Sequence, residues 1–240
     1  MRKVIVVVAL LILAAALSLF LKVTRIEVSG LKTLDANAVV SAGRLAVGES
    51  LLFADTEGAE KRILAEFPYA ESVSIHRKLP TTLRINLVES VSLAYIELTD
   101  GSCAKISDSG RVLEVSRDTE NPPEGIHIIG IGEGTAKAGQ IYEPTADETI
   151  RFGYCLEFLQ AVNAPEGSGI IGLISYIDAG DLLDFKFDLK FYRGFTVYLG
   201  SREETIRKLG TLSQTLEKLG ANDSGSIDLS VIGEAHLIPD

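Results

Sequence analysis

Cysteine is scarce in this 240-residue chain, which contains only Cys103 and Cys155. Two cysteines in a chain of this length cannot form the disulfide framework of a small secreted domain. They could pair with each other in an oxidising compartment, or they could be two thiols in the core. A net positive charge is also lacking, since the formal net charge is −10. Nucleic-acid binding requires a basic face, so nucleic acid is excluded as a partner class.

Recognisable catalytic motifs are absent as well. The chain has no Gly-x-Ser-x-Gly elbow and no His-Glu-x-x-His sequence. Residues 129–134 resemble a dinucleotide-binding loop, but Gly139 and Pro144 follow where that fingerprint requires a helix. The three histidines lack metal-ligand spacing and fall in separate expected strands: His76, His127 and His236. We therefore predict that the protein is not an enzyme and has no cofactor, no metal and no small-molecule substrate.

One long hydrophobic run is present near the start of the chain. In residues 4–21, Ser18 is the only polar residue. At 1.5 Å per residue a helix of this length spans roughly 27 Å, about the thickness of a bilayer core. We predict a transmembrane anchor over residues 4–21, with a cytoplasmic stub of residues 1–3 and the rest of the chain outside the cytoplasm. A cleaved secretory signal is the alternative, because Ala14-Ala15-Ala16 resembles a cleavage site.

Residues 23–90 combine the two periodicities of strands and helices. Alternating apolar residues predict strands, and apolar stripes at helical spacing, with Pro68 as a stop and Gly43 as a closing residue, predict helices. The expected elements are, in chain order, a strand at 23–29, helices at 35–42 and 56–67, and strands at 70–77 and 81–89. A three-stranded sheet covered on one side by two helices buries the apolar face of every element.

Residues 91–240 are dominated by short alternating runs and turns. The expected strands are 93–98, 103–106, 111–115, 126–129, 172–178, 181–192, 194–199, 226–230 and 234–238. A first helix is expected at 146–162, with a buried stripe that includes Ile150. A second is expected to open with a capping box at 201–204, to bury Ile206, and to end at Leu219 with Gly220 behind it. This half of the chain therefore predicts a mixed, β-rich domain with two helices.

Short motifs along the chain occur in the order found in a known family. They are Arg25–Gly30, Gly48–Leu51, Phe67–Val73, Arg77–Ile85, Leu189–Tyr192, Val197–Gly200, Lys208-Leu209 and Gly225–Ser230. In this order, behind a membrane span, they resemble the FtsQ/DivIB family of bacterial cell-division proteins. The family commonly has a basic residue and a proline after the position of Glu89, where this chain has Ser90-Val91.

The resemblance implies an α+β fold in three parts. These are one N-terminal transmembrane helix, a POTRA domain (β-α-α-β-β) over residues 23–90, and a second β domain over residues 91–240. It also implies a non-catalytic bitopic scaffold in the cell membrane at the division septum, with the N-terminus in the cytoplasm and the bulk outside. The partners that it implies are division proteins of the FtsB (DivIC) and FtsL type and, through them, the septal peptidoglycan synthase.

The resemblance also carries over a partner-binding site along the last strands of the β domain. The residues are Ser230, Val231, Ile232, Gly233, Glu234, Ala235, His236 and Leu237. Basic and aromatic side chains contribute in the family, whereas this chain has Ser230 and Val231, so backbone pairing with an added strand is the expected mode. The run 234–238 contains no protective lysine, which favours an open edge. Pairing of that edge within the domain is the alternative.

Two other classes of function remain as alternatives. A POTRA-type chaperone or secretion and assembly factor would carry several tandem POTRA units ahead of a membrane barrel, and the sequence contains neither. An extracytoplasmic enzyme without a recognisable motif would need acid, base or metal-ligand side chains that only the folded chain brings together.

Overall fold

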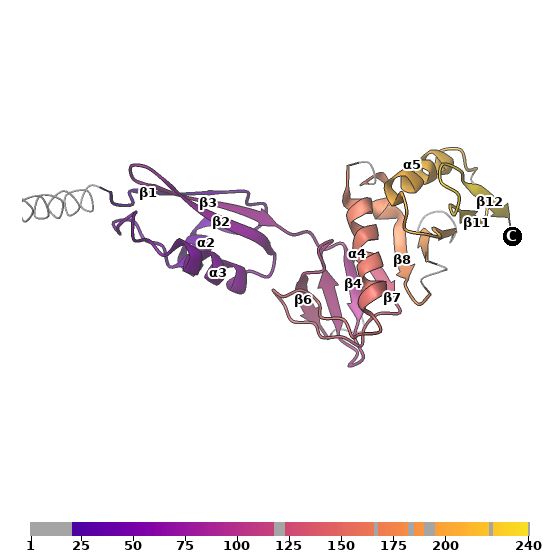
Figure 1. Cartoon of the computed structure of the whole chain (residues 1–240), viewed down its shortest axis with the longest axis horizontal. Coiled ribbons are helices and arrows are strands. Elements are labelled where there is room, and N and C mark those ends of the chain that lie inside the picture. The colour runs from indigo at the N-terminus through magenta and orange to yellow at the C-terminus, as the bar shows by residue number, and fades with distance from the viewer. Residues whose placement is uncertain are drawn as a thin grey trace, which may run out of the picture. The chain divides into compact units, whose positions relative to one another are not determined.

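The computed structural model describes residues 21–117, 123–165, 168–181, 185–189, 195–220 and 223–239. The chain forms two compact units, divided between Ser90 and Val91 (Figure 1). The predicted anchor at residues 4–21 lies outside the described residues, apart from Leu21. Within the described part, no helix is both long enough and apolar enough to cross a bilayer.

The first unit has the predicted order β-α-α-β-β. Its elements are β1 (Arg25–Ser29), α2 (Ala36–Gly43), α3 (Thr56–Glu66), β2 (Ala70–Lys78) and β3 (Thr82–Glu89). The sheet order is β1-β3-β2, with β1 parallel and β2 antiparallel to the central strand β3. Both helices cover the same face of this sheet (Figure 1). The expected sheet with two helices on one side is therefore confirmed.

Side-chain caps explain where the helices of the first unit begin. Asp35 accepts a hydrogen bond from Ala38 N (2.9 Å), and Asp55 accepts one from Gly58 N (3.0 Å). Gly43 is the last residue of α2, but the left-handed residue that follows it is Arg44 (φ 53°). A Cβ on Gly43 would lie 3.2 Å from Ile63 Cδ1, so this glycine allows α2 and α3 to approach closely.

The described residues of the second unit form one nine-stranded sheet with two α-helices and a 3₁₀ helix. Its strands are β4 (Ala94–Glu97), β5 (Cys103–Ile106), β6 (Val112–Ser116), β7 (Ile126–Ile129), β8 (Ile174–Asp178), β9 (Lys186–Leu189), β10 (Thr196–Tyr198), β11 (Gly225–Asp228) and β12 (His236–Pro239). The helices are α4 (Thr149–Asn163), η1 (Ser168–Leu173) and α5 (Thr205–Leu216). The strand order is β12-β11-β10-β9-β8-β7-β4-β5-β6. The last strand of the chain is thus at one edge, as expected.

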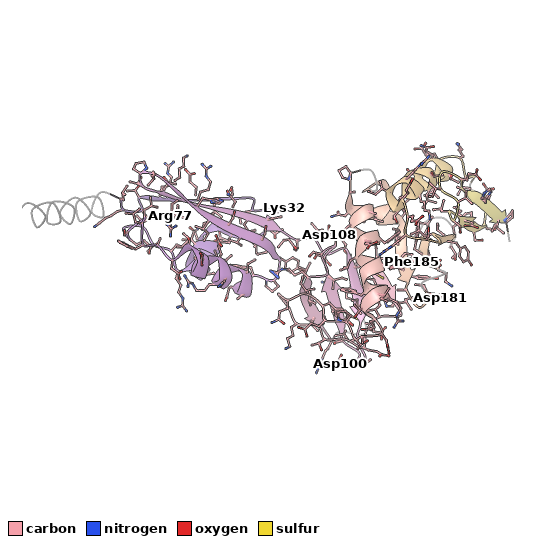
Figure 2. The ribbon with its side chains drawn as sticks, in the orientation of Figure 1. Lys32, Arg77, Asp100, Asp108, Asp181 and Phe185 are labelled. Carbon is pink, nitrogen blue, oxygen red and sulfur yellow. The ribbon has the colours of Figure 1, made fainter. Side chains whose placement is uncertain are left out.

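Aromatic residues dominate the centre of this second core. Phe158 of α4 packs against Phe185 and Phe187, with ring centroids 5.5 Å and 5.0 Å apart. Figure 2 labels Phe185 beside α4. Cys103 and Cys155 are buried free thiols, which matches the interpretation as two core thiols. Burial raises the pKa of Cys155 to about 12, so this thiol stays protonated and unreactive.

Several details of the second unit differ from the sequence prediction. Ile150 is 64% exposed, although the helical stripe placed it in the core. The strand expected at 172–178 begins only at Ile174, because η1 precedes it. Of the strand expected at 181–192, the described residues include β9; residues 182–184 and 190–192 lie outside them.

The predicted start and end of α5 are wrong. The helix begins at Thr205, and Glu204 before it is left-handed (φ 51°) and makes no capping hydrogen bond with its side chain. The turn before the helix is held instead by the buried Lys208, whose Nζ donates to Leu199 O (2.8 Å) and Ser201 O (2.7 Å). The helix ends at Leu216, so Gly220 does not close it, and Ile206 is exposed.

Candidate functional site

The candidate site is the open side of β12 together with the turn that precedes it, residues 230–239, which we call the β12 edge. β12 runs antiparallel to β11, with Asp228 opposite His236, Ile227 opposite Leu237, and Ser226 opposite Ile238. No other described strand pairs with β12, and all four of its residues are exposed. The backbone groups on its outer side are therefore accessible to an added strand.

The position of Ile238 shows which backbone groups of β12 face outward. A Cβ on Gly225 of β11 would lie 2.1 Å from the carbonyl oxygen of Ile238, so this carbonyl points toward β11. In a strand, the N–H and C=O groups of successive residues point to opposite sides. The backbone groups of Ile238 and His236 therefore face β11, and the N–H and C=O of Leu237 face away from it.

Apolar side chains accompany this outward backbone. Leu237 is 39% exposed and Ile238 is 51% exposed, and Val231 and Ile232 in the preceding turn are exposed as well. Gly233 supplies the positive φ (83°) of that turn, which Glu234 N closes by donating to Val231 O (3.2 Å). The β12 edge thus offers one free backbone pair flanked by hydrophobic surface, which is a combination typical of a strand-addition site.

The strand beneath the edge is held firmly in the second core. Ile227 and Leu229 are completely buried, and Leu229 N donates to Tyr198 O (2.9 Å). The Asp228 carboxylate accepts hydrogen bonds from Ser230 Oγ (2.5 Å) and Ser230 N (2.7 Å), which lower its pKa. These contacts fix the direction in which the chain leaves β11, and therefore the start of the turn toward β12.

The opposite edge of the same sheet is covered at the start of β6. Val112 N of β6 donates to Gln140 O (2.7 Å), and Gly139 N donates to Val112 O (2.8 Å), so the loop at 139–141 takes the place of a further strand. Glu114 of β6 also pairs with Lys105 of β5 at 2.8 Å. The start of this edge is therefore closed by its own chain, whereas no described segment pairs with the outer side of β12.

The structure brings the expected partner-binding residues together as one continuous segment. Ser230 to Gly233 form the exit from β11 and the turn, and His236 and Leu237 lie in β12. Ala235 is partly buried against the core, so its side chain is less accessible than the others. Ile238 was not among the expected binding residues, although the alternating run 234–238 already contained it.

The other residues considered for chemistry are dispersed. His76 is exposed at β2, His127 stacks on Tyr95 with ring centroids 4.7 Å apart, and His236 Nε2 lies 3.1 Å from Glu234 Oε2. Within the described residues, no group of three or more His, Cys, Asp or Glu side chains could hold a metal ion.

The glycine-rich loop at 130–134 has a structural partner. The buried Glu148 carboxylate accepts hydrogen bonds from Gly132 N (2.5 Å) and Glu133 N (2.8 Å). Burial alone would raise the pKa of Glu148, but these bonds outweigh it and lower the pKa. The next helix, α4, begins only at Thr149, so the loop lacks the helix that a dinucleotide site requires.

Known proteins resemble this chain over most of its length. A family model described as "POTRA domain, FtsQ-type" matches residues 21–90. The cell division protein FtsQ of Corynebacterium glutamicum is 27% identical over 218 residues, which cover 90% of this chain and 88% of that protein. The cell division protein DivIB of Clostridium botulinum is 24% identical over 216 residues, 89% of this chain and 80% of that protein.

A third relative matches more closely over a shorter stretch. The cell division protein FtsQ of Mycolicibacterium smegmatis is 34% identical over 96 residues, 38% of this chain and 28% of that protein. The FtsQ-type domain at 21–90 coincides with the β-α-α-β-β unit, and the longer matches continue through the nine-stranded sheet. The first unit is therefore an FtsQ-type POTRA domain, and the chain as a whole is similar to the FtsQ and DivIB cell-division proteins.

Proposed function

We propose that this protein is a non-catalytic, membrane-anchored scaffold of the division machinery that binds its partner by strand addition at the β12 edge. In this proposal residues 4–21 anchor the chain and both units lie outside the cytoplasm at the division septum. The partners are division proteins of the FtsB (DivIC) and FtsL type, which connect it to the septal peptidoglycan synthase. The observation that carries the proposal is the outward-facing backbone of Leu237 on an otherwise uncovered edge strand.

The physical basis is the cost of an unpaired strand edge. An incoming strand would pair its own backbone with the N–H and C=O of Leu237 and cover Leu237 and Ile238. A typical hydrogen bond contributes about 0.5–1.5 kcal/mol net, whereas a buried group left unpaired costs about 1–3 kcal/mol. The backbone therefore contributes both affinity and register, and the exposed apolar side chains add burial.

The direct test compares two substitutions at one position. Leu237→Pro removes the outward N–H and leaves the bonds to β11 intact, while Leu237→Ala removes most of the side chain and keeps the N–H. Binding of the extracytoplasmic segment of the FtsB-type protein is measured by calorimetry. We expect the proline variant to bind about tenfold or more weakly than the alanine variant, since 1.4 kcal/mol corresponds to a factor of ten.

The control is the thermal unfolding of the two variants, which should coincide. Equal affinities for the folded proline and alanine variants would rule out strand addition at this edge. The septal location is tested separately with a fluorescent fusion, which should gather at midcell in dividing cells. A uniform envelope signal throughout the cell cycle would contradict the septal role without affecting the binding result.

A further inference from the structure

A group of exposed apolar side chains lies at one end of the first unit. Val47, Leu52 and Phe53 belong to the loop between α2 and α3, and Leu79 belongs to the turn between β2 and β3. Phe53 is 80% exposed and Leu79 is 67% exposed. We call these four residues the apolar rim. Large apolar side chains that gather on a soluble surface mark a contact with another molecule or with a membrane.

Backbone hydrogen bonds hold both parts of the rim against the first described residues of the chain. On one side, Leu51 N donates to Leu21 O (2.8 Å) and Gly48 N donates to Val23 O (2.7 Å). On the other side, Thr24 N donates to Thr81 O (2.8 Å). The rim therefore surrounds the point at which the chain continues into the apolar run 4–21.

The loop that carries most of the rim is fixed in place. Leu51, in the middle of the loop, is completely buried in the core of the first unit. Arg77 of β2 donates from Nε to Leu51 O (2.9 Å) and from Nη2 to Ala54 O (2.7 Å). Figure 2 labels Arg77 near the end of the unit where β1 begins and Lys32 near the opposite end. The exposure of Leu52 and Phe53 is thus built into a braced loop.

The charges beside the rim suit an anionic surface. The backbone of Lys22 forms an isolated β-bridge with Ser50, which lies in the loop between α2 and α3. Lys78 directly precedes Leu79, and both lysines are exposed. Of the nearby acidic groups, Asp55 is paired with Arg62 (3.1 Å), and Glu49 Oε1 accepts a hydrogen bond from Ala46 N (3.2 Å). Lysines flanking apolar side chains are the arrangement that anionic lipid headgroups attract.

We propose that the apolar rim inserts into the interface of a phospholipid bilayer next to the membrane anchor, and so sets the orientation of the first unit on the membrane. This inference rests on the proposed function, because it requires residues 4–21 to be the anchor. At 1.5 Å per helical residue the anchor ends at the bilayer surface, and Leu21 and Lys22 then lie at headgroup level. The loop and the turn that carry the rim are hydrogen-bonded to residues 21–24, so the apolar side chains of the rim meet the lipid there.

The absence of tryptophan from the chain makes a direct test possible. Phe53→Trp places the only tryptophan of the full-length protein in the rim. Val88→Trp is the matched control, because Val88 is also exposed and lies in β3, six positions beyond Thr82, or roughly 20 Å from the rim end. Each full-length variant is reconstituted into vesicles that contain phosphatidylglycerol, with and without brominated acyl chains.

The expected result is an emission shift to shorter wavelength and quenching by the brominated lipid for Phe53→Trp, with neither effect for Val88→Trp. A wavelength shift without quenching would mean that protein covers the rim, either the anchor or another subunit, and would overturn the lipid contact. Emission at the wavelength of water-exposed tryptophan would overturn it as well. Failure of the protein to float with the vesicles would overturn the anchor itself, and with it the inference, so the two failures are distinguishable.

Discussion

Two edge strands in this molecule, β2 in the first unit and β12 in the second, differ in how their outward backbone groups are covered. At β2, the outward N–H of Ile75 donates to Glu60 Oε1 (2.6 Å), so a helix side chain caps the edge. The exposed end of β2 also carries His76, Arg77 and Lys78. Within the described residues, no carboxylate caps the backbone of β12 in this way, and its exposed side chains include Leu237 and Ile238.

The difference indicates which surface is built for a partner strand. Charged side chains and capped N–H groups discourage the addition of a strand, whereas an uncovered edge with apolar neighbours permits it. The first unit completes its own hydrogen bonds with carboxylates from within, at Glu60 and at Glu89. At the β12 edge no described carboxylate does so, and the outer backbone is available to the proposed partner strand. Substitutions at four residues would break or sharpen this contrast.

The largest effect is expected from Glu89 in the first unit. Its buried carboxylate accepts hydrogen bonds from Lys32 N (2.6 Å), Thr33 Oγ1 (2.7 Å) and Leu34 N (3.1 Å), besides Thr33 N. Glu89→Ala leaves these donors unpaired and should lower the free energy of unfolding by about 3 kcal/mol. Urea unfolding measures the change. The exposed Glu66→Ala is the control and should shift stability by less than about 0.5 kcal/mol.

The same residue makes a pH-dependent prediction. Burial alone would raise the pKa of Glu89, but its hydrogen bonds lower it from 4.5 to about 2. A depressed pKa contributes stability that is fully present above pH 4.5 and is lost as the pH falls toward 2. The stability difference between the wild type and Glu89→Gln should therefore shrink over that interval. A constant difference would show that ionisation of Glu89 does not matter.

The next largest effect is expected from Gly225, which keeps β12 in register. Gly225→Ala combines a positive φ (134°) with a Cβ only 2.1 Å from the backbone oxygen of Ile238. We expect a strain of about 1–3 kcal/mol that is relieved when β12 leaves β11, with loss of partner binding. Hydrogen exchange at the amide of Ile238 reports the detachment. Gly101→Ala has a positive φ (79°) but open space around it, so it should leave binding intact.

A smaller effect is expected from uncapping the edge of the first unit. Glu60→Ala leaves the N–H of Ile75 without its acceptor and should cost about 1–2 kcal/mol. It should also increase self-association, measured by analytical ultracentrifugation, because β2 then resembles β12. Glu60→Gln keeps an acceptor oxygen and should return self-association to the wild-type level. If Glu60→Ala did not increase self-association, the hydrogen bond from Ile75 N to Glu60 would not be what protects the β2 edge.

The smallest effect on stability is expected from a charge placed on the open edge. Ile238→Lys changes an exposed side chain, so the free energy of unfolding should stay within about 0.5 kcal/mol of the wild type. Partner binding should nevertheless weaken, because a lysine on an edge strand opposes strand addition. Calorimetry with the partner segment measures this, and undiminished affinity would show that the partner does not cover Ile238.

The sequence predicted elements whose burial follows directly from a regular period. In β3, Leu83, Ile85 and Leu87 alternate toward the core as expected, and Ile227 and Leu229 do so near the end of the chain. In α5 the helical period predicted Leu209, Leu212 and Leu216 correctly but placed Ile206 inside. Tertiary contacts decided which side of α5 is buried. Carbonyl oxygens in the turn before the helix accept hydrogen bonds from the Lys208 ammonium group and so allow a charged residue to be buried.

The same division applies to the candidate site. The composition of residues 234–238 alone indicated an unprotected strand, since it depends only on which residues are present. Which N–H groups face outward depends on the register with β11, and Gly225 and Ile238 fix that register through contacts that no local pattern contains. The apolar rim is a similar case. Phe53 lies in the loop between α2 and α3 and Leu79 in the turn between β2 and β3, and backbone bonds to Leu21–Thr24 hold that loop and that turn at one end of the unit. Periodicity is a local property of the chain, whereas an edge or a rim is created by pairing between distant segments.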